Sequence, residues 1–235
     1  MKYTWAGATH VGRVRANNED GFAPPTDGLS SGPAVFAVAD GMGGHVAGEV
    51  ASKLAIEAAM ETDGNALDRV LAGNSRVVEA IIADPSLGGM GTTLTLIALS
   101  ADGDLDLAHI GDSRAYRLRG GVLEQLTSDH TLVAELVAEG RLDPKEVRAH
   151  PQRNLITRVI GMGKKIEPDQ MSDRALDGDR LLLCSDGLSS MLEDSKIAEL
   201  LGASMPEEAV WSLIEAANNA GGEDNITVIV VDTRA

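Results

Sequence analysis

The chain has little cysteine and no long apolar run. Cys184 is its single cysteine in 235 residues, so an intramolecular disulfide is excluded and a cysteine-based zinc site is disfavoured. Every apolar run stops before the roughly 18 to 20 residues that cross a bilayer, and no N-terminal segment has the pattern of a signal peptide. We therefore expect a single domain over residues 1–235, monomeric and cytoplasmic, with no membrane span.

Basic residues are scarce relative to acidic ones. The chain has 20 Lys and Arg against 36 Asp and Glu, a formal net charge of −16. Such a charge repels nucleic-acid phosphates and anionic lipid, which argues against a nucleic-acid partner. The acidic excess could serve solubility alone, or some carboxylates could be neutralised by bound cations. Composition leaves both interpretations open.

Short apolar runs predict strands, and longer segments with apolar residues at helical spacing predict helices. The expected strands are 34–39, 93–99, 105–110, 181–184 and 226–231, and the expected helices are 46–60, 66–82, 131–139 and 206–218. Strands and helices do not alternate strictly, and strand runs are paired between 93 and 126. This favours antiparallel sheets covered by helices over a doubly wound parallel sheet. The stretch from about 130 to 165 is interpreted as an insertion over the core.

Aspartates stand next to glycines where three of the strand-like runs end. These pairs are Asp40-Gly41, Gly111-Asp112 and Asp186-Gly187, and Asp224 precedes the last run. A strand end holds a side chain at the rim of a sheet, while glycine lets the backbone turn or approach a ligand closely. Clustered carboxylates repel one another unless a cation intervenes, and they favour Mg²⁺ or Mn²⁺. One such pair is more typical of a turn, but their recurrence indicates a metal site.

The N-terminal segment adds an arginine to these carboxylates. Arg15 lies a few residues before Glu19 and Asp20. A guanidinium group can hold a phosphate through two parallel hydrogen bonds, although a lone arginine is more often a surface ion-pair partner. Cys184 ends an apolar run and lacks the glycine loop that a cysteine nucleophile needs to hold phosphate, so we predict a core thiol.

The order of these motifs resembles that of the metal-dependent protein phosphatases, the PPM or protein phosphatase type 2C family, above all its compact bacterial members. The matching runs include VADGMGGH (38–45), HIGDSRAY (109–116), LTSDHTLV (126–133), HPQRNLITRVIG (150–161), LLLCSDGL (181–188) and GGEDNITVIVV (221–231). The resemblance implies an α+β fold, a four-layer α-β-β-α sandwich of two antiparallel β-sheets flanked by helices. It also implies a flap at about 131–165 beside the metal site.

The resemblance further implies two or three Mn²⁺ or Mg²⁺ ions as cofactors. Asp40 would bridge the two main ions, and Gly41 would offer its backbone carbonyl to one of them. Asp186 and Asp224 would complete the shell of the other ion. Asp112 would hold a third, weaker ion together with Asp186.

Other residues would act around this metal shell. By the same resemblance, Glu19 and Asp20 would contact the ions directly or through water, and Arg15 would bind the substrate phosphate. Met42 stands where animal relatives have a histidine proposed as the general acid. His45 is our substitute for it, although His45 could equally hydrogen-bond the start of the following helix, and a metal-bound water could also donate the proton.

The implied activity is hydrolysis of phosphoserine and phosphothreonine in proteins by direct attack of a metal-bridging water or hydroxide. No covalent phosphoenzyme is needed, and serine/threonine kinases and their targets are the expected substrates. A non-catalytic adaptor would need a lost metal ligand, and the spacing of an EF-hand is absent. A dedicated regulator of one phosphorylated factor stays possible. In the flap, Arg141, Lys145, Arg148 and Arg153 could contact a phosphopeptide or form an ordinary solvated surface.

Overall fold

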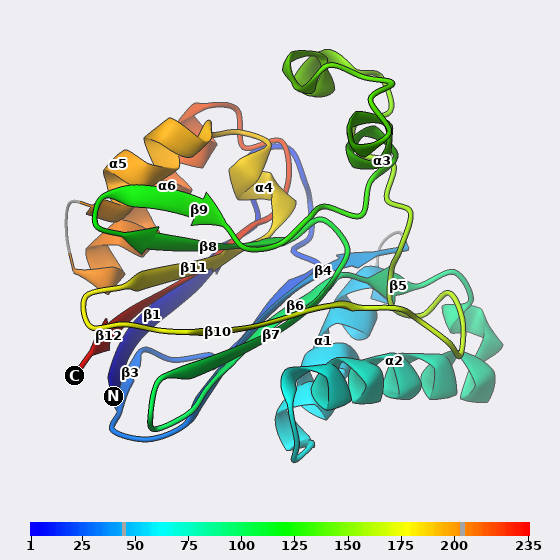
Figure 1. The fold of residues 1–235 in the computed structure, drawn as a ribbon. Coiled ribbons are helices and arrows are strands. Elements are labelled where there is room, and N and C mark those ends of the chain that lie inside the picture. Colours follow the sequence, from blue (N-terminus) through cyan, green and yellow to red (C-terminus); the bar gives the residue numbers. More distant parts are fainter. Residues whose placement is uncertain (44–45, 203–204) are drawn as a thin grey trace.

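The chain folds into two β-sheets packed face to face, each covered on its outer side by helices (Figure 1). The computed structural model describes residues 1–43, 46–202 and 205–235. All strand pairs are antiparallel, which confirms the predicted four-layer sandwich.

Within the described residues, each sheet has six strands. The first sheet runs in the order β3 (Gly28–Ser30), β1 (Lys2–His10), β12 (Ile226–Arg234), β11 (Arg180–Cys184), β8 (Arg114–Arg119) and β9 (Val122–Gln125). The second runs β10 (Asp169–Arg174), β7 (Asp104–Ile110), β6 (Leu94–Leu99), β4 (Ala34–Met42) and β2 (Asp20–Ala23), with β5 (Gly91–Thr92) paired to β4.

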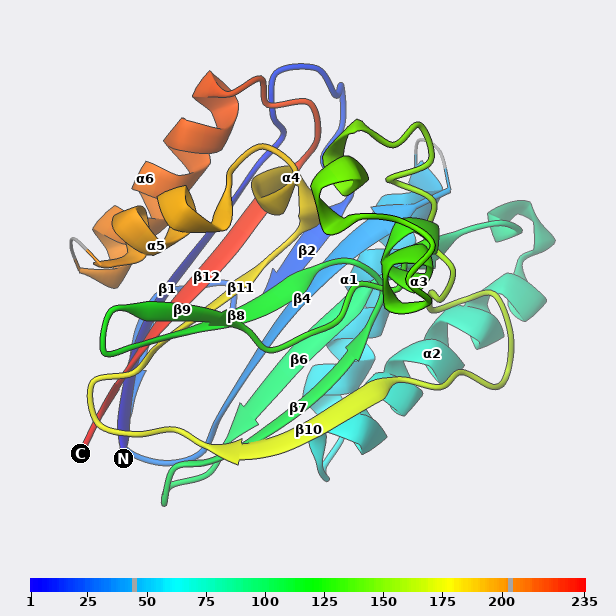
Figure 2. The same cartoon turned by 45° about the horizontal axis from the view of Figure 1, so that its top comes forward.

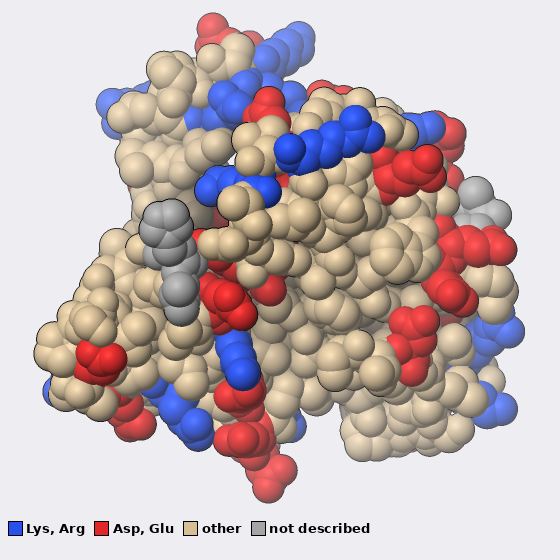
Figure 3. Space-filling model, turned by 180° about the vertical axis from the view of Figure 1, so that it is seen from behind, with Lys and Arg blue, Asp and Glu red and all other residues tan. Residues whose placement is uncertain are grey.

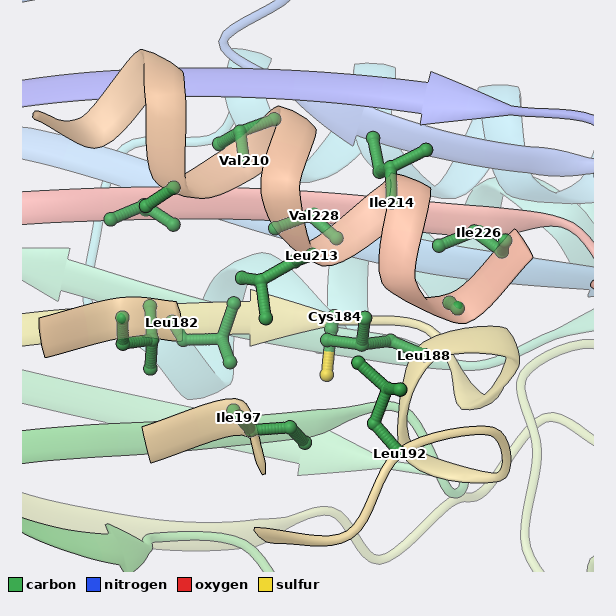
Figure 4. Packing of buried hydrophobic residues seen from close by; sticks show 14 of the residues in the cluster. Leu182, Cys184, Leu188, Leu192, Ile197, Val210, Leu213, Ile214, Ile226 and Val228 are labelled. Carbon is green, nitrogen blue, oxygen red and sulfur yellow. The ribbon is translucent and has the colours of Figure 1, made fainter. Parts of the chain in front are cut away.

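Both faces of the central strands are buried, which explains their nearly continuous apolar runs. In β11, Leu181 and Leu183 point into the core between the sheets. Leu182 and Cys184 point to the opposite side, against the outer helices (Figure 4). This alternation follows from the two-residue period of a strand. Cys184 is fully buried, and burial raises the pKa of its thiol to about 12, so the predicted core thiol is confirmed.

The helices cover the two outer faces. The outer face of the first sheet carries α4 (Asp186–Ser189), α5 (Asp194–Gly202) and α6 (Pro206–Asn219), and the second carries α1 (Val46–Glu61) and α2 (Ala66–Ala83), followed by a 3₁₀ turn η1 (Pro85–Leu87). Val210, Leu213 and Ile214 of α6 are buried against the sheet. Burying a side chain of this size contributes about 1.5–3 kcal/mol. No described helix is long and apolar enough to span a membrane.

The predicted flap leaves the sandwich between β9 and β10 (Figure 2). It contains α3 (Leu132–Ala138) and a 3₁₀ helix η2 (Pro144–Ala149). Thr131 caps α3 by accepting a hydrogen bond from the backbone N–H of Ala134, and Asp143 with Glu146 forms a capping box at the start of η2. The flap therefore contains two short helices, and each begins at a side-chain cap within the flap itself.

Several elements lie outside the predicted strands and helices. The strand β1 is interrupted by small residues in KYTWAGATH, and the edge strand β10 is almost entirely polar in DQMSDR, so neither shows an apolar run. The single-turn helix α4 is too short for a periodic pattern. These elements form because neighbouring strands and helices provide their hydrogen bonds and their buried face.

Candidate metal centre

The predicted site residues meet at one end of the sandwich, around a cavity of about 650 Å³. Its lining includes Arg15, Glu19, Asp40, Gly41, Met42, Asp112, Asp186 and Asp224. Asp20 is half-buried close to this cluster, near enough to Asp186 and Asp224 for their charges to act on it. His45, the predicted general acid, lies outside the described residues.

Both sheets contribute carboxylates to this end. Asp20 on β2 is the register partner of Asp40 on β4, so these two aspartates are cross-strand neighbours. Asp186 follows β11 and opens α4, while Asp224 lies just before β12, the strand beside β11. Asp112 lies in the turn between β7 and β8. The predicted co-location of Asp40, Asp186 and Asp224 at one rim is therefore confirmed.

The backbone at Asp40 is held from the neighbouring chain segment. The N–H of Asp40 donates to Thr93 Oγ1 (2.9 Å), and the Asp40 carbonyl accepts from Thr93 N–H (2.9 Å) and from Thr92 Oγ1 (2.9 Å). Both threonines are fully buried. These hydrogen bonds fix the main chain at Asp40, whose side chain lines the cavity.

Two glycines allow the segments to approach closely enough to build the site. A Cβ atom at Gly41 would collide with the backbone oxygens of Gly48 and Glu19. A Cβ at Gly187 would collide with the carbonyl oxygen of Asn225. The Asp-Gly pairs thus place a carboxylate and a tight backbone contact side by side, as the sequence pattern indicates.

Asp20 is supported by two hydroxyl groups. Its Oδ2 accepts from Ser185 Oγ (2.7 Å) and from Thr227 Oγ1 (2.6 Å). Burial nevertheless raises the pKa of Asp20 to about 7, because desolvation and the neighbouring Asp186 and Asp224 oppose ionisation more than the hydrogen bonds favour it.

The pKa values of the other carboxyl groups in the cluster are raised as well. Burial, and then the charge of Asp224, raises the pKa of Asp186 to about 6. The pKa values of Asp40 and Asp112 are raised well above their usual range by burial and by nearby aspartates. Among the described residues, Oδ1 atoms of Asp20, Asp112 and Asp186 are buried without a hydrogen-bond partner. Crowded carboxylate oxygens with unused acceptor capacity fit hard divalent cations.

Arg15 contacts this cluster directly. Its guanidinium donates to Asp224 Oδ2 at 2.6 Å, and its side chain is 56% exposed at the mouth of the cavity. In this arrangement Asp224 is engaged by Arg15 and Asp20 by hydroxyls. In the described part of the chain, no three His, Cys, Asp or Glu side chains form a ready-made ligand group. A cation bound through Asp224 Oδ2 would compete with Arg15 for that oxygen.

Asn225 organises the N-terminal part of the site and was not predicted. Its Nδ2 donates to the carbonyls of Val11 and Asn17 (both 2.9 Å), and its Oδ1 accepts from the N–H of Glu19 (2.8 Å). It thereby holds the loop that carries Arg15 beside Asp224. The signal available in the sequence is an asparagine directly after a predicted metal ligand, in the run GGEDNITVIVV.

The flap borders a second, larger groove of about 990 Å³ that shares Asp112 and Asp186 with the first cavity. Lys145 and Arg153 line this groove. Arg148 also lines this groove, but its guanidinium is already engaged. It donates to the carbonyls of Ser189, Ser190 and Leu192 and pairs with Glu193 at 2.8 Å. Figure 3 shows lysine and arginine side chains around the projecting flap and acidic side chains below it.

Comparison with known proteins agrees with this architecture. The sequence profile described as Protein phosphatase 2C matches residues 6–219. The chain belongs to the protein phosphatase 2C family.

Individual relatives are bacterial serine/threonine phosphatases. PstP of Mycobacterium tuberculosis is 47% identical over 97% of this chain, which spans 44% of that relative's length. PhpP of Streptococcus pneumoniae is 40% identical, covering 95% of this chain and 94% of the relative. The solved catalytic domain of PstP in complex with 2 manganese ions is 42% identical and superposes over 100% of both chains with a TM-score of 0.88.

Proposed function

We propose that the protein is a metal-dependent protein serine/threonine phosphatase that hydrolyses phosphoserine and phosphothreonine. The observation that carries this proposal is the cluster of partly buried carboxylates with raised pKa values and unpartnered oxygens, beside the guanidinium of Arg15 in an open cavity. The family and the names of the relatives support the same activity.

The carboxylates would hold two or three Mn²⁺ or Mg²⁺ ions. Asp40 and the Gly41 carbonyl would serve the main pair with Asp186 and Asp224, and Asp112 would serve a third ion with Asp186. Bound cations would supply an acidified water and stabilise negative charge on the phosphoryl group, so no enzyme nucleophile is required. The two manganese ions in the PstP catalytic domain support this ligand chemistry.

Arg15 would bind and orient the phosphate. Its exposed guanidinium sits at the mouth of the cavity, where it can exchange Asp224 for a phosphate oxygen pair. Glu19 and Asp20 would support the ions directly or through water. His45 is the proposed donor of the proton to the leaving alkoxide.

The substrate would be a phosphorylated protein whose flanking residues occupy the groove beneath the flap. That groove opens beside Asp112 and Asp186 and is lined by both signs of charge, including Lys145, Arg153 and Glu223. We infer that serine/threonine kinases and their targets are the substrates, with the protein acting as a monomer in the cytoplasm. The lone, buried Cys184 supports a reducing compartment.

The test is phosphate release from a phosphothreonine peptide by the purified protein. Activity should appear with Mn²⁺ or Mg²⁺, vanish with excess chelator and return when the metal is restored. A matched peptide carrying phosphotyrosine should be a poor substrate. Activity that persists in chelator, or no release from any phosphopeptide at saturating Mn²⁺, would overturn the proposal.

A further inference from the structure

A row of buried polar side chains runs beneath the carboxylates, from Asp40 to the base of the flap. Its members are Thr93, Thr95, His109, Ser113 and His130, each at most 1% exposed. Thr93 Oγ1 lies 2.8 Å from Ser113 Oγ, and Thr95 Oγ1 contacts both the Ser113 carbonyl (3.0 Å) and His109 Nδ1 (2.9 Å). The His109 ring in turn lies against the ring of His130, with 4.9 Å between their centroids. Buried polar groups are unfavourable unless they are hydrogen-bonded, and members of this row act as hydrogen-bond partners for one another.

The last member, His130, holds both backbone polar groups of Gly111. Its N–H donates to the Gly111 carbonyl (2.8 Å), and the Gly111 N–H donates to its ring Nδ1 (3.1 Å). Gly111 has φ +115°, and a Cβ there would collide with Thr93. Gly111 immediately precedes Asp112, the proposed ligand of the third cation. The position of Asp112 therefore depends on a turn clamped by one histidine.

The same residue ties together the two ends of the flap. The His130 carbonyl accepts from Thr157 N–H (2.8 Å), and the next residue, Thr131, bridges to Ile156 before it caps α3. Figure 2 shows the chain leaving β9, passing through α3 and returning to β10. His130 thus stands where the outgoing and returning segments of the flap meet.

The second ring nitrogen faces the strand that follows the flap. His130 Nε2 lies 3.2 Å from Asp169 Oδ2 at the start of β10, a close approach without ideal hydrogen-bond alignment. Asp169 also pairs with Arg158 at 3.0 Å. Because Gly111 N–H must donate to Nδ1, the neutral ring carries its proton on Nε2. Burial lowers the pKa of His130 and lowers that of His109 to about 4, which keeps both rings neutral.

We propose that His130 is a positioning residue that holds Asp112 in place for the third cation and couples that position to the flap. This inference rests on the proposed function, because it takes Asp112 to be a cation ligand. The coupling runs through Gly111 on one side and through Thr157 and Thr131 on the other.

Two substitutions of His130 test the contacts of its two ring nitrogens separately. His130→Asn places an amide oxygen near the position of Nδ1, so it can still accept the Gly111 N–H. His130→Gln reaches toward Asp169 instead and leaves the buried Gly111 N–H without its acceptor. Removing such supporting groups behind a metal ligand lowers metal affinity by about 10- to 100-fold.

The experiment titrates metal-free protein with Mn²⁺ and follows free Mn²⁺ by electron paramagnetic resonance, without substrate. His130→Gln should weaken the weakest class of sites by about tenfold or more while leaving the tighter classes within about twofold. His130→Asn should keep all classes near the parent. A parallel experiment measures amide hydrogen exchange in the flap, at residues 131–157. Occupancy of the weakest Mn²⁺ sites should slow this exchange in the parent and in His130→Asn, but not in His130→Gln.

Other results of these titrations would contradict either the inference about His130 or the proposed function. If His130→Gln and the parent have the same Mn²⁺ affinities, the inference is overturned. It is also overturned if His130→Gln weakens every class of Mn²⁺ sites and unfolds at a lower temperature, because such a result indicates a general structural role for His130. The parent protein could bind Mn²⁺ as expected while the Asp112→Ala variant keeps the weakest class of Mn²⁺ sites. That result would overturn the inference but not the proposed function. A parent that binds no Mn²⁺ would overturn the proposed function and the inference with it.

Discussion

Replacing Arg15 by alanine tests whether its guanidinium binds the substrate phosphate. The side chain is 56% exposed and lies 2.6 Å from Asp224 at the cavity that the proposed metal ligands line. If it exchanges Asp224 for phosphate during turnover, Arg15→Ala removes a charge-assisted contact of about 1.5–3 kcal/mol. At 1.4 kcal/mol per factor of ten, kcat/KM should fall by about 10- to 150-fold, mainly through KM.

The same substitution should affect metal binding far less. An exposed ion pair of this kind contributes only about 0–1 kcal/mol, so cation affinity should change by less than about fivefold. The change should be toward tighter binding, because the cation no longer competes with the charge of Arg15 for Asp224. Arg15→Lys is the matched control: it keeps the charge but loses the two-pronged contact, and its kcat/KM should fall between those of the parent and Arg15→Ala.

The assay measures kcat and KM on a phosphothreonine peptide at saturating Mn²⁺, together with a Mn²⁺ titration of each variant. A loss of less than about twofold in kcat/KM for Arg15→Ala would return Arg15 to the role of a surface ion-pair partner. A fall in metal affinity as large as the fall in kcat/KM would show that Arg15 builds the metal site instead.

Three other perturbations follow from the same structure. Asp112→Ala should slow turnover while the tighter Mn²⁺ sites keep their affinity; equal weakening of all sites in a titration would contradict the third-ion assignment. Without cations, the pKa is raised to about 7 for Asp20, to about 6 for Asp186, and well above the usual range for Asp40 and Asp112, so these four carboxyls bind more protons in the folded chain. The lowered pKa values of His109 and His130 act in the opposite direction, but they are only two groups against four. The free energy of unfolding should therefore fall as pH rises from about 4 to 7 in chelator and recover with Mn²⁺; denaturant unfolding that shows the opposite slope would refute this. Replacing Arg141 and Lys145 together by serine should change the relative kcat/KM values for phosphopeptides of differing charge. The kcat/KM for a small aryl phosphate should stay within a fewfold of the parent value, and an equal loss on both kinds of substrate would refute a role of these residues in selectivity.

Local sequence was enough to predict the main carboxylates of the site. Asp40 and Asp186 each follow an apolar run and precede glycine, and strand ends necessarily lie at a sheet rim. Asp224 could be added because it precedes the last strand run. The pairing of Asp20 with Asp40 could not be derived in this way, since it depends on the register of β2 against β4.

The supporting residues were harder to predict because their partners are distant in sequence. Asn225 binds Val11 and Asn17, more than 200 residues away. The sequence assigns no role to His130, because a single histidine in TSDHTLV carries no periodic or spacing signal. The sequence predicts Arg148 as a cation available to substrate, but Arg148 instead donates to the carbonyls of Ser189 and Leu192, a contact that forms only when the flap is folded.

The two-ion assignment of Asp40 is the central claim, and one paired measurement tests it most directly. Asp40→Asn keeps the size of the side chain and the backbone hydrogen bonds to Thr92 and Thr93 but removes the charge that both main ions would share. At saturating Mn²⁺, phosphate release from a phosphothreonine peptide should be abolished in a variant that retains the far-ultraviolet circular dichroism of the parent and loses its tight Mn²⁺ binding. A folded Asp40→Asn protein that keeps near-parental turnover would contradict the account.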